Sequence, residues 1–230
     1  MRLTRTIKTM NWRYAIGEVF LIVVGISIAL GANAWWENRL ERLEERSVLA
    51  TLKRSLQIDL REFEENQRIH LDQESKIITL VEHMEGVEPY YPGLNPYFRS
   101  VRRWAGVTSN NAPYEALKSR GFALISDEGL RNNIIYYYEN LVHQLTGAGD
   151  NDRAFVTERV NPYTDRNFLS EDPVMMVPLD YESLRRDVYY RNLCMMKLFR
   201  LQTFIIPQYQ QTNKMIRDLI TDIDAELGDS

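Results

Sequence analysis

The first strong pattern in the chain is an uninterrupted apolar run near its N-terminus. Val19–Ala34 contains sixteen residues without a charge, and the residues on either side extend the run to about 22. At 1.5 Å per residue, a helix of this length spans roughly the 30 Å hydrocarbon layer of a bilayer. The pattern therefore predicts a transmembrane helix over residues 15–36.

The flanks of this run indicate its orientation. Residues 1–14 contain four basic side chains and no acidic one, while Trp35 and Trp36 lie at the far end. Basic residues favour the cytoplasmic side, and tryptophan rings favour the membrane interface. We therefore expect 1–14 to be a basic cytoplasmic tail, the two tryptophans to be interface anchors, and 37–230 to form an extracytoplasmic domain.

Two alternatives compete with an uncleaved anchor. The run could instead be the buried core helix of a soluble protein, although such helices rarely have a basic head and an aromatic tail. Ala32-Asn33-Ala34 also has the small-x-small form that signal peptidase accepts, so cleavage after Ala34 would release a soluble protein. The length of the run and the acidic Glu18 at its leading edge argue against cleavage.

Glu18 belongs to a stripe of small and polar positions along the predicted helix. Successive spacings of four, three, four and four residues put five positions within about 60° of one another. These are Glu18, Ile22, Gly25, Ala29 and Asn33. Small residues let helix backbones approach closely, and polar side chains bond across helices. The stripe predicts packing against another membrane helix, in a second copy or in a different protein; the alternative is that Glu18 only reaches the cytoplasmic headgroups.

The pattern changes after Trp36 to that of an amphipathic helix. Residues 37–85 lack proline and glycine, and their apolar positions form one stripe, interrupted by a polar stretch at 66–74. The stripe consists of Leu49, Leu52, Leu56, Leu60, Phe63, Ile77, Ile78 and Val81. A sustained heptad is missing, so we expect one long helix that packs on its own domain and continues directly from the membrane helix.

The remaining chain predicts an irregular all-α bundle. A turn rich in proline and glycine at 86–96 precedes shorter helices over about 96–168, and a long helix kinked or broken at Pro207 covers about 181–227. Strand alternation is too short to build a sheet.

Turn and cap residues divide this part of the chain further. A polar loop is predicted at 106–112 and another at 146–152, TGAGDND. Pro113 should open a helix that Gly121 ends, and Ser126 or Asp127 should cap the next one. Pro173 and Pro178 flank a short apolar run.

Charge and cysteine content exclude some classes of function. The net charge is −4, and because residues 1–14 carry +4, the remainder carries −8. An acidic body argues against nucleic-acid binding, which needs clustered cations. The single cysteine, Cys194, excludes an internal disulfide.

The sequence contains no strong catalytic, cofactor-binding or metal-binding motif. Glu139 and His143 are four residues apart, a weak metal pair that is better explained as a surface contact. Cys194 lies in an apolar helical stretch and fits a core position better than a nucleophile. The tyrosines at 136–138 and 189–190 suggest ligand stacking, although tyrosines on packed helices more often belong to the core or an interface.

The N-terminal motif resembles that of a large bacterial family of single-pass membrane proteins of unknown function. The matching residues are Tyr14, Gly17, Glu18, Gly25, Ile26, Ile28, Ala29, Leu30, Asn33, Trp36 and Glu37. Residues 114–141 and the closing helix, IRDLITDIDAEL, are similar to the family as well. The Ala-Asn-Ala and Trp-Trp junction replaces a more polar one. The resemblance implies an uncleaved anchor in a bacterial inner membrane and supplies no activity.

Two functional hypotheses follow. In the first, the protein is a non-enzymatic bitopic membrane protein that presents a helical domain in the periplasm and binds a partner or forms a homo-oligomer. In the second, it is a membrane-tethered sensor that binds a small ligand between helices, with tyrosines lining the pocket.

Overall fold

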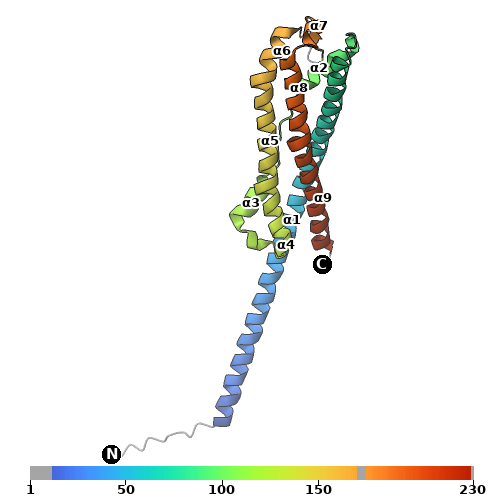
Figure 1. Cartoon of the computed structure of the whole chain (residues 1–230). Helices are drawn as coiled ribbons and strands as arrows, with labels where there is room; N and C mark the ends of the chain where they lie inside the picture. The colour runs from blue at the N-terminus through green and yellow to red at the C-terminus, as the bar shows by residue number, and fades with distance from the viewer. Residues whose placement is uncertain (1–11, 170–174, 229–230) are drawn as a thin grey trace, which may run out of the picture. The chain divides into compact units, whose positions relative to one another are not determined.

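The computed structural model describes residues 12–169 and 175–228 and is all-α, as predicted (Figure 1). The chain divides into two compact units, residues 1–47 and 48–230. The helices are α1 (Trp12–Glu85), α2 (Asn95–Arg102), α3 (Ala112–Arg120), α4 (Glu128–Tyr136), α5 (Val142–Phe155), α6 (Asn161–Asn167), α7 (Tyr181–Leu184), α8 (Val188–Arg200) and α9 (Ile206–Gly228). Short 3-10 helices at Pro92–Leu94 and Phe122–Leu124 precede α2 and follow α3.

Helix α1 runs without interruption through both predicted elements, the apolar span and the long amphipathic helix. Its apolar part lies in the first unit, where every described side chain from Ile16 to Glu44 is exposed. The basic residues up to position 11 lie outside the described residues.

In the second unit, one face of α1 supplies a large part of the hydrophobic core. The predicted positions Leu49, Leu52, Leu56, Phe63, Ile77 and Val81 are buried, and Leu60 and Ile78 are partly buried against them. The amphipathic stripe is therefore confirmed as a packing surface within its own domain.

A row of polar side chains on α1 holds the irregular segment at residues 103–111. Asp59 accepts hydrogen bonds from the backbone nitrogen of Asn110 at 2.8 Å and from the hydroxyl of Ser109 at 2.7 Å. Glu62 accepts from the nitrogen of Thr108 at 3.3 Å, and Asn66 donates to the carbonyl of Gly106 at 3.3 Å. These positions on α1 are three and four residues apart and form one row along the helix. The row satisfies backbone groups that have no secondary structure of their own.

The loop predicted at 146–152 is wrong, because α5 continues through it. From α4 to Asn167 the chain is helical throughout, with single π-helical turns at Tyr137–Leu141 and Val156–Val160. Gly149 permits a close approach: a Cβ atom there would lie 3.3 Å from the side chain of Val107 and 3.5 Å from the carbonyl of Ala105. The glycine that suggested a turn instead lies inside a helix, at a position where a larger residue would have to displace Val107 slightly.

The cap predictions agree with the structure in detail. Proline stands in the first turn of α3, and Gly121 follows its last residue with a φ of 105°, a conformation that favours glycine. Asp127 caps α4 by accepting from the nitrogen of Leu130 at 2.5 Å.

The predicted long helix over 181–227 begins later in the structure and contains a π-helical turn near its centre. Asp180 caps the short α7, and Asp187 caps α8 by accepting from the nitrogen of Tyr189 at 2.7 Å, so the long helix begins at Val188. At Pro207 the helix is not broken. A π-helical turn at Leu201–Ile205 ends two residues before the proline and widens the helix where the ring would meet the carbonyl one turn back.

A small antiparallel strand pair lies between α6 and α7. Strands β1 (Phe168–Leu169) and β2 (Val177–Pro178) pair Phe168 with Pro178 and Leu169 with Val177. Pro173 and the start of the predicted apolar run lie outside the described residues. The pair is too short to alter the fold class.

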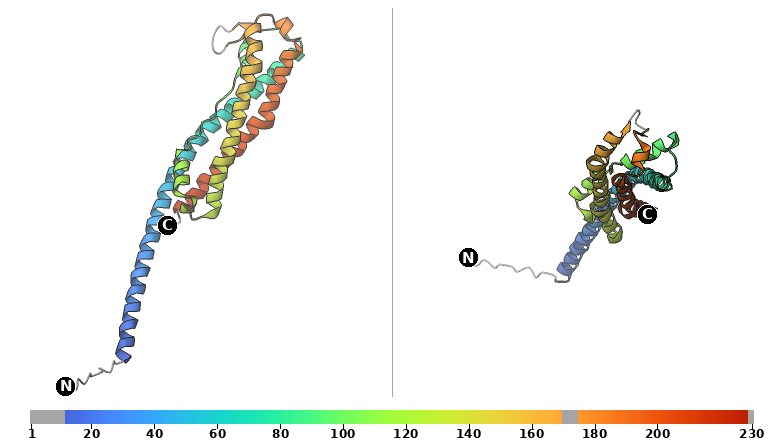
Figure 2. Two further views of the ribbon diagram at one scale, coloured as in Figure 1. Left: turned by 90° about the vertical axis from the view of Figure 1, so that its left-hand side faces the viewer. Right: turned by 45° about the horizontal axis from the view of Figure 1, so that its top comes forward.

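Within the second unit, α5 lies beside α8 and α9, as two views agree (Figures 1 and 2). Helix α9 packs on α4 and α5, and α2 packs on α8. The core between them is rich in tyrosine: Tyr137, Tyr190 and Tyr209 are among its largest fully buried side chains. Packing of α5 against α8 and α9 creates the environment of the site described next.

Candidate functional site

The predicted helix-association stripe lies on the exposed part of α1. All five of its residues are exposed, and a Cβ atom added at Gly25 would meet no other atom within 4 Å. Asn33 donates its side-chain nitrogen to Glu37 at 2.8 Å, one turn further along the same helix. The structure of this chain thus leaves the stripe open to an approaching surface.

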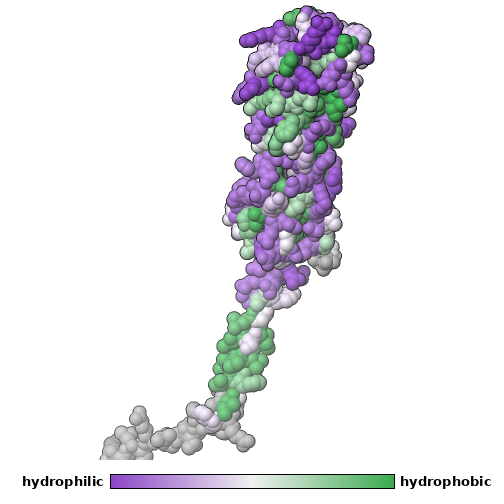
Figure 3. Space-filling view, in the orientation of Figure 1, coloured by the Kyte–Doolittle hydropathy of each residue, from purple (hydrophilic) through white to green (hydrophobic). Residues whose placement is uncertain are grey.

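The two predicted interface anchors are exposed neighbours near the end of the apolar run. Trp35 and Trp36 are 62% and 55% exposed, and the guanidinium of Arg39 lies 5.8 Å from the ring centre of Trp35. Figure 3 shows the apolar surface of the run giving way to hydrophilic residues beyond this point of α1. One stretch of α1 is long and apolar enough to cross a membrane.

The weak chemical candidates from the sequence have structural explanations. Glu139 accepts hydrogen bonds from the hydroxyl of Tyr114 at 2.8 Å and the ammonium of Lys118 at 2.7 Å. No group of three histidine, cysteine, aspartate or glutamate side chains among residues 12–169 and 175–228 is arranged to hold a metal. Cys194 is fully buried, and burial raises the pKa of its thiol to about 12. A protonated, inaccessible thiol is a poor nucleophile.

The tyrosine clusters divide between the core and the surface. Tyr137, Tyr138 and Tyr190 are buried, and Tyr136 and Tyr189 are exposed. Tyr137 donates its hydroxyl to Asp59 at 2.9 Å, which links it to the polar row of α1. Most of these tyrosines therefore have the core role that packed helices favour.

A buried ion pair joins α5 to α8. Lys197 is fully buried, and its ammonium lies 2.5 Å from Oδ2 of Asp152, whose side chain is 2% exposed. The same ammonium donates to the carbonyl of Arg103 at 2.9 Å. Burial lowers the pKa of Lys197, while the carboxylate of Asp152 opposes this shift by favouring the charged form.

Helix α1 contributes two further polar side chains to this layer. Gln73 donates to the carbonyls of Ser100 and Arg103, both at 2.7 Å, and its carboxamide oxygen lies 3.1 Å from Nδ1 of His70. Burial lowers the pKa of His70; the hydrogen bond with Gln73 acts in the opposite direction, and the positive charge of Lys197 reinforces the lowering. The layer therefore places a histidine whose neutral form is favoured by burial beside the Asp152–Lys197 ion pair.

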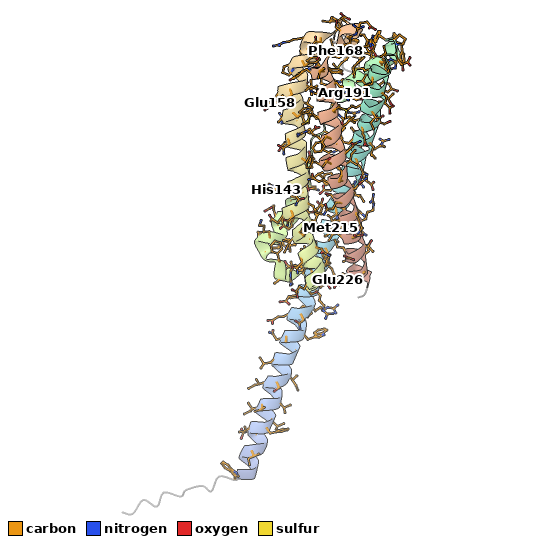
Figure 4. The ribbon with its side chains drawn as sticks, in the orientation of Figure 1. His143, Glu158, Phe168, Arg191, Met215 and Glu226 are labelled. Carbon is orange, nitrogen blue, oxygen red and sulfur yellow. The ribbon has the colours of Figure 1, made fainter. Side chains whose placement is uncertain are left out.

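A cavity of about 370 Å³ opens between α5 and the turn that joins α8 to α9. Its lining residues are His143, Gln144, Gly147, Ala148, Asn151, Arg200, Phe204, Ile205 and Gln208. Figure 4 marks His143 on α5. The volume falls in the range of small-molecule sites. The prediction that tyrosines line a pocket between helices is wrong for this cavity, because the buried tyrosines fill the core instead.

Arg200 connects the cavity to the ion pair. Its Nε lies 3.7 Å from Oδ1 of Asp152, too far for a hydrogen bond, and has no hydrogen-bond partner among the described residues. Its guanidinium stacks 5.3 Å from the ring centre of Phe155. Two cations therefore share one buried carboxylate, and Lys197 makes the closer contact with it.

This site is not predicted by the sequence patterns above, although one signal for it is present. Tyr190, Cys194, Lys197 and Leu201 are spaced by four, three and four residues, which puts the lysine in the buried row of α8. A charge in such a row predicts a buried partner. That the partner is Asp152, inside an expected loop, could not be read from the pattern.

Comparisons with known proteins returned nothing for this chain: no protein-family model, no curated protein and no solved structure matches it. Functional inference therefore depends on the residues and their geometry.

Removing one member of the ion pair should destabilise the second unit strongly. Asp152→Asn leaves Lys197 buried without a counter-charge, and we expect a loss of about 3–5 kcal/mol in the free energy of unfolding. The double variant Asp152→Leu/Lys197→Met should lose less than this single one. Chemical denaturation of the full chain in detergent measures both. Asp218→Asn, which removes an exposed partner of Lys214, is the matched control and should change stability little. A loss for Asp152→Asn as small as the control's would contradict the role of the pair.

Acid should weaken the fold through His70. Since its pKa is lower in the folded chain than in the unfolded one, its neutral form contributes stability above about pH 6.5 that is lost as the pH falls through the folded-state pKa. The free energy of unfolding should therefore decrease from about pH 7.5 to about pH 5. In His70→Gln the decrease should be smaller. An unchanged pH dependence in that variant would assign the effect to other groups.

Proposed function

We propose that the protein is a single-pass protein of a bacterial inner membrane, with its N-terminus in the cytoplasm and its helical domain in the periplasm. One observation carries the proposal: the apolar side chains of the run at 19–34 are all exposed on α1. A soluble protein rarely leaves so much contiguous apolar surface in water. The lipid bilayer is the partner that covers such a surface on all sides.

The orientation follows from charge. The four basic residues before the run favour retention of that end in the cytoplasm, and the tryptophans fit the opposite interface. The bacterial assignment rests on the resemblance of the N-terminal motif. The acidic body supports a role without nucleic acid.

Within the membrane, we propose that the stripe from Glu18 to Asn33 packs against another helix. A carboxylate and a carboxamide are costly when they face lipid, and a helix interface with small residues gives them partners. The second helix belongs either to another copy of the chain or to a different membrane protein. The protein would then act as a structural or interaction module and not as an enzyme.

The cavity beside Arg200 supports a second candidate, a membrane-tethered sensor. Its size fits a small ligand, the guanidinium of Arg200 lines it, and the carboxamide oxygen of Gln208 has no hydrogen-bond partner among the described residues. In this role, ligand binding outside the cytoplasm would change which partner the anchored domain contacts.

Membrane attachment can be tested by fractionation. A C-terminally tagged chain should remain in the membrane fraction at full length after alkaline carbonate washing, because a spanning helix is not removed by a change of pH or salt. Immunoblotting of membrane and soluble fractions measures this. A shortened band in the soluble fraction would instead support cleavage after Ala34.

Helix association can be tested with a membrane self-association reporter fused to residues 12–40. The double variant Gly25→Leu/Ala29→Leu should abolish the signal, because both substitutions place bulk on the stripe. Val23→Leu and Ile28→Leu, which alter positions outside the stripe, should retain it. If the stripe variant associates as well as the parent, the proposal of self-association through this face is wrong. In that case, capture of a second membrane protein by the parent and not by the variant would identify a hetero-partner.

A further inference from the structure

The cavity between α5 and the α8–α9 turn is lined by a positive charge and by no negative one among the described residues. Among the described residues that line it, Arg200 has the one permanently charged side chain, and none of them is acidic. The nearby side chain of Asp152 is only 2% exposed, and its Oδ2 lies 2.5 Å from the ammonium of Lys197. Two cations, Lys197 and Arg200, thus face one carboxylate, and the guanidinium of Arg200, 23% exposed, is the cationic group that lines the cavity.

The walls of the cavity contain both polar and apolar side chains. Gln144 and Asn151 on α5 are exposed and polar, and the apolar lining consists of Ala148, the buried Ile205 and the exposed ring of Phe204. Gln208 lies eight residues beyond Arg200 on the same helical stretch, about 12 Å along the axis at 1.5 Å per residue. Its carboxamide oxygen is shielded from solvent and has no donor among the described residues.

We propose that this cavity binds a small organic acid: its carboxylate pairs with Arg200, its apolar body lies against Phe204 and Ile205, and a hydrogen-bond donor at its other end meets Gln208. A guanidinium and a carboxylate match in charge and in the geometry of two parallel hydrogen bonds. A phosphate group fits less well, because a dianion at a single arginine beside a buried aspartate lacks a second cation. The inference specifies the ligand of the second proposed function and rests on it.

The experiment uses the full chain in detergent and three related probes. 3-(4-Hydroxyphenyl)propanoate carries all three proposed features, its amide lacks the charge, and 3-phenylpropanoate lacks the donor. Inorganic phosphate tests for an anion without an apolar body. The melting temperature is measured against probe concentration. Above its Kd, the hydroxy acid should raise the melting temperature by roughly 3–6 °C for each tenfold increase. The phenylpropanoate should need a higher concentration, and the amide and phosphate should have no effect.

Three variants locate the binding. Arg200→Gln should abolish the shift, and so should Gly147→Leu, which fills the cavity from α5, where a Cβ atom meets nothing within 4 Å. Arg186→Gln removes an arginine that is 72% exposed at a distant position and should keep the shift. Circular dichroism checks that each variant folds. If Arg200→Gln does not fold, the comparison of acid with amide in the parent chain and the Gly147→Leu variant decide.

The outcomes separate this inference from the sensor function. An amide that shifts the parent chain as strongly as the acid, with loss of the shift in Gly147→Leu, would overturn the carboxylate assignment and keep the cavity as a ligand site. Shifts that persist in both Arg200→Gln and Gly147→Leu would place binding elsewhere. No shift with any probe up to millimolar concentration would contradict both the ligand class and the sensor.

Discussion

The structure of the helical domain depends on how α1 holds the segment at residues 103–111. Nine consecutive residues there have no regular secondary structure, so their backbone groups need partners from elsewhere. A row of polar side chains on α1 supplies them: Asp59, Glu62, Asn66 and Gln73 each bond to this segment. The row begins among the apolar positions Leu60 and Phe63, so this part of α1 combines apolar packing with hydrogen bonding.

This arrangement also affects the contacts that the buried charged side chains of α5 and α8 make. Because Gln73 fixes the carbonyl of Arg103, that oxygen is available to Lys197 at 2.9 Å. The ammonium of Lys197 also contacts Oδ2 of Asp152, and Nε of Arg200 has no hydrogen bond to the same carboxylate. The cationic cavity is thus a consequence of the way in which a buried lysine is satisfied, and Gly149 contributes by letting α5 approach the segment.

Sequence patterns predicted the fold well where one residue type has one dominant role. The apolar stripe of α1, the cap at Asp127 and the helix end at Gly121 all followed from local chemistry. The patterns gave wrong predictions where tertiary packing gives a residue a different structural role. Gly147 and Gly149 suggested a loop, yet both lie in helix α5, where Gly149 is in close contact with the segment at residues 103–111 and Gly147 borders open space. The candidate site was missed for the same reason, since Lys197 and Asp152 are 45 residues apart and only the fold brings them together.

The account of the whole chain requires that α1 meet lipid over its apolar run. Nitroxide labels at single cysteines from Val19 to Ala34 test this most directly, with the full chain reconstituted in vesicles. Native Cys194 is fully buried with its pKa raised, so it should not take up label. The account predicts low collision rates with a water-soluble nickel complex throughout this interval, and high collision rates with oxygen everywhere except at Gly25 and Ala29, where a second helix excludes lipid. Nickel collision rates as high at Val24 and Ile28 as at exposed residues of the helical domain would contradict it.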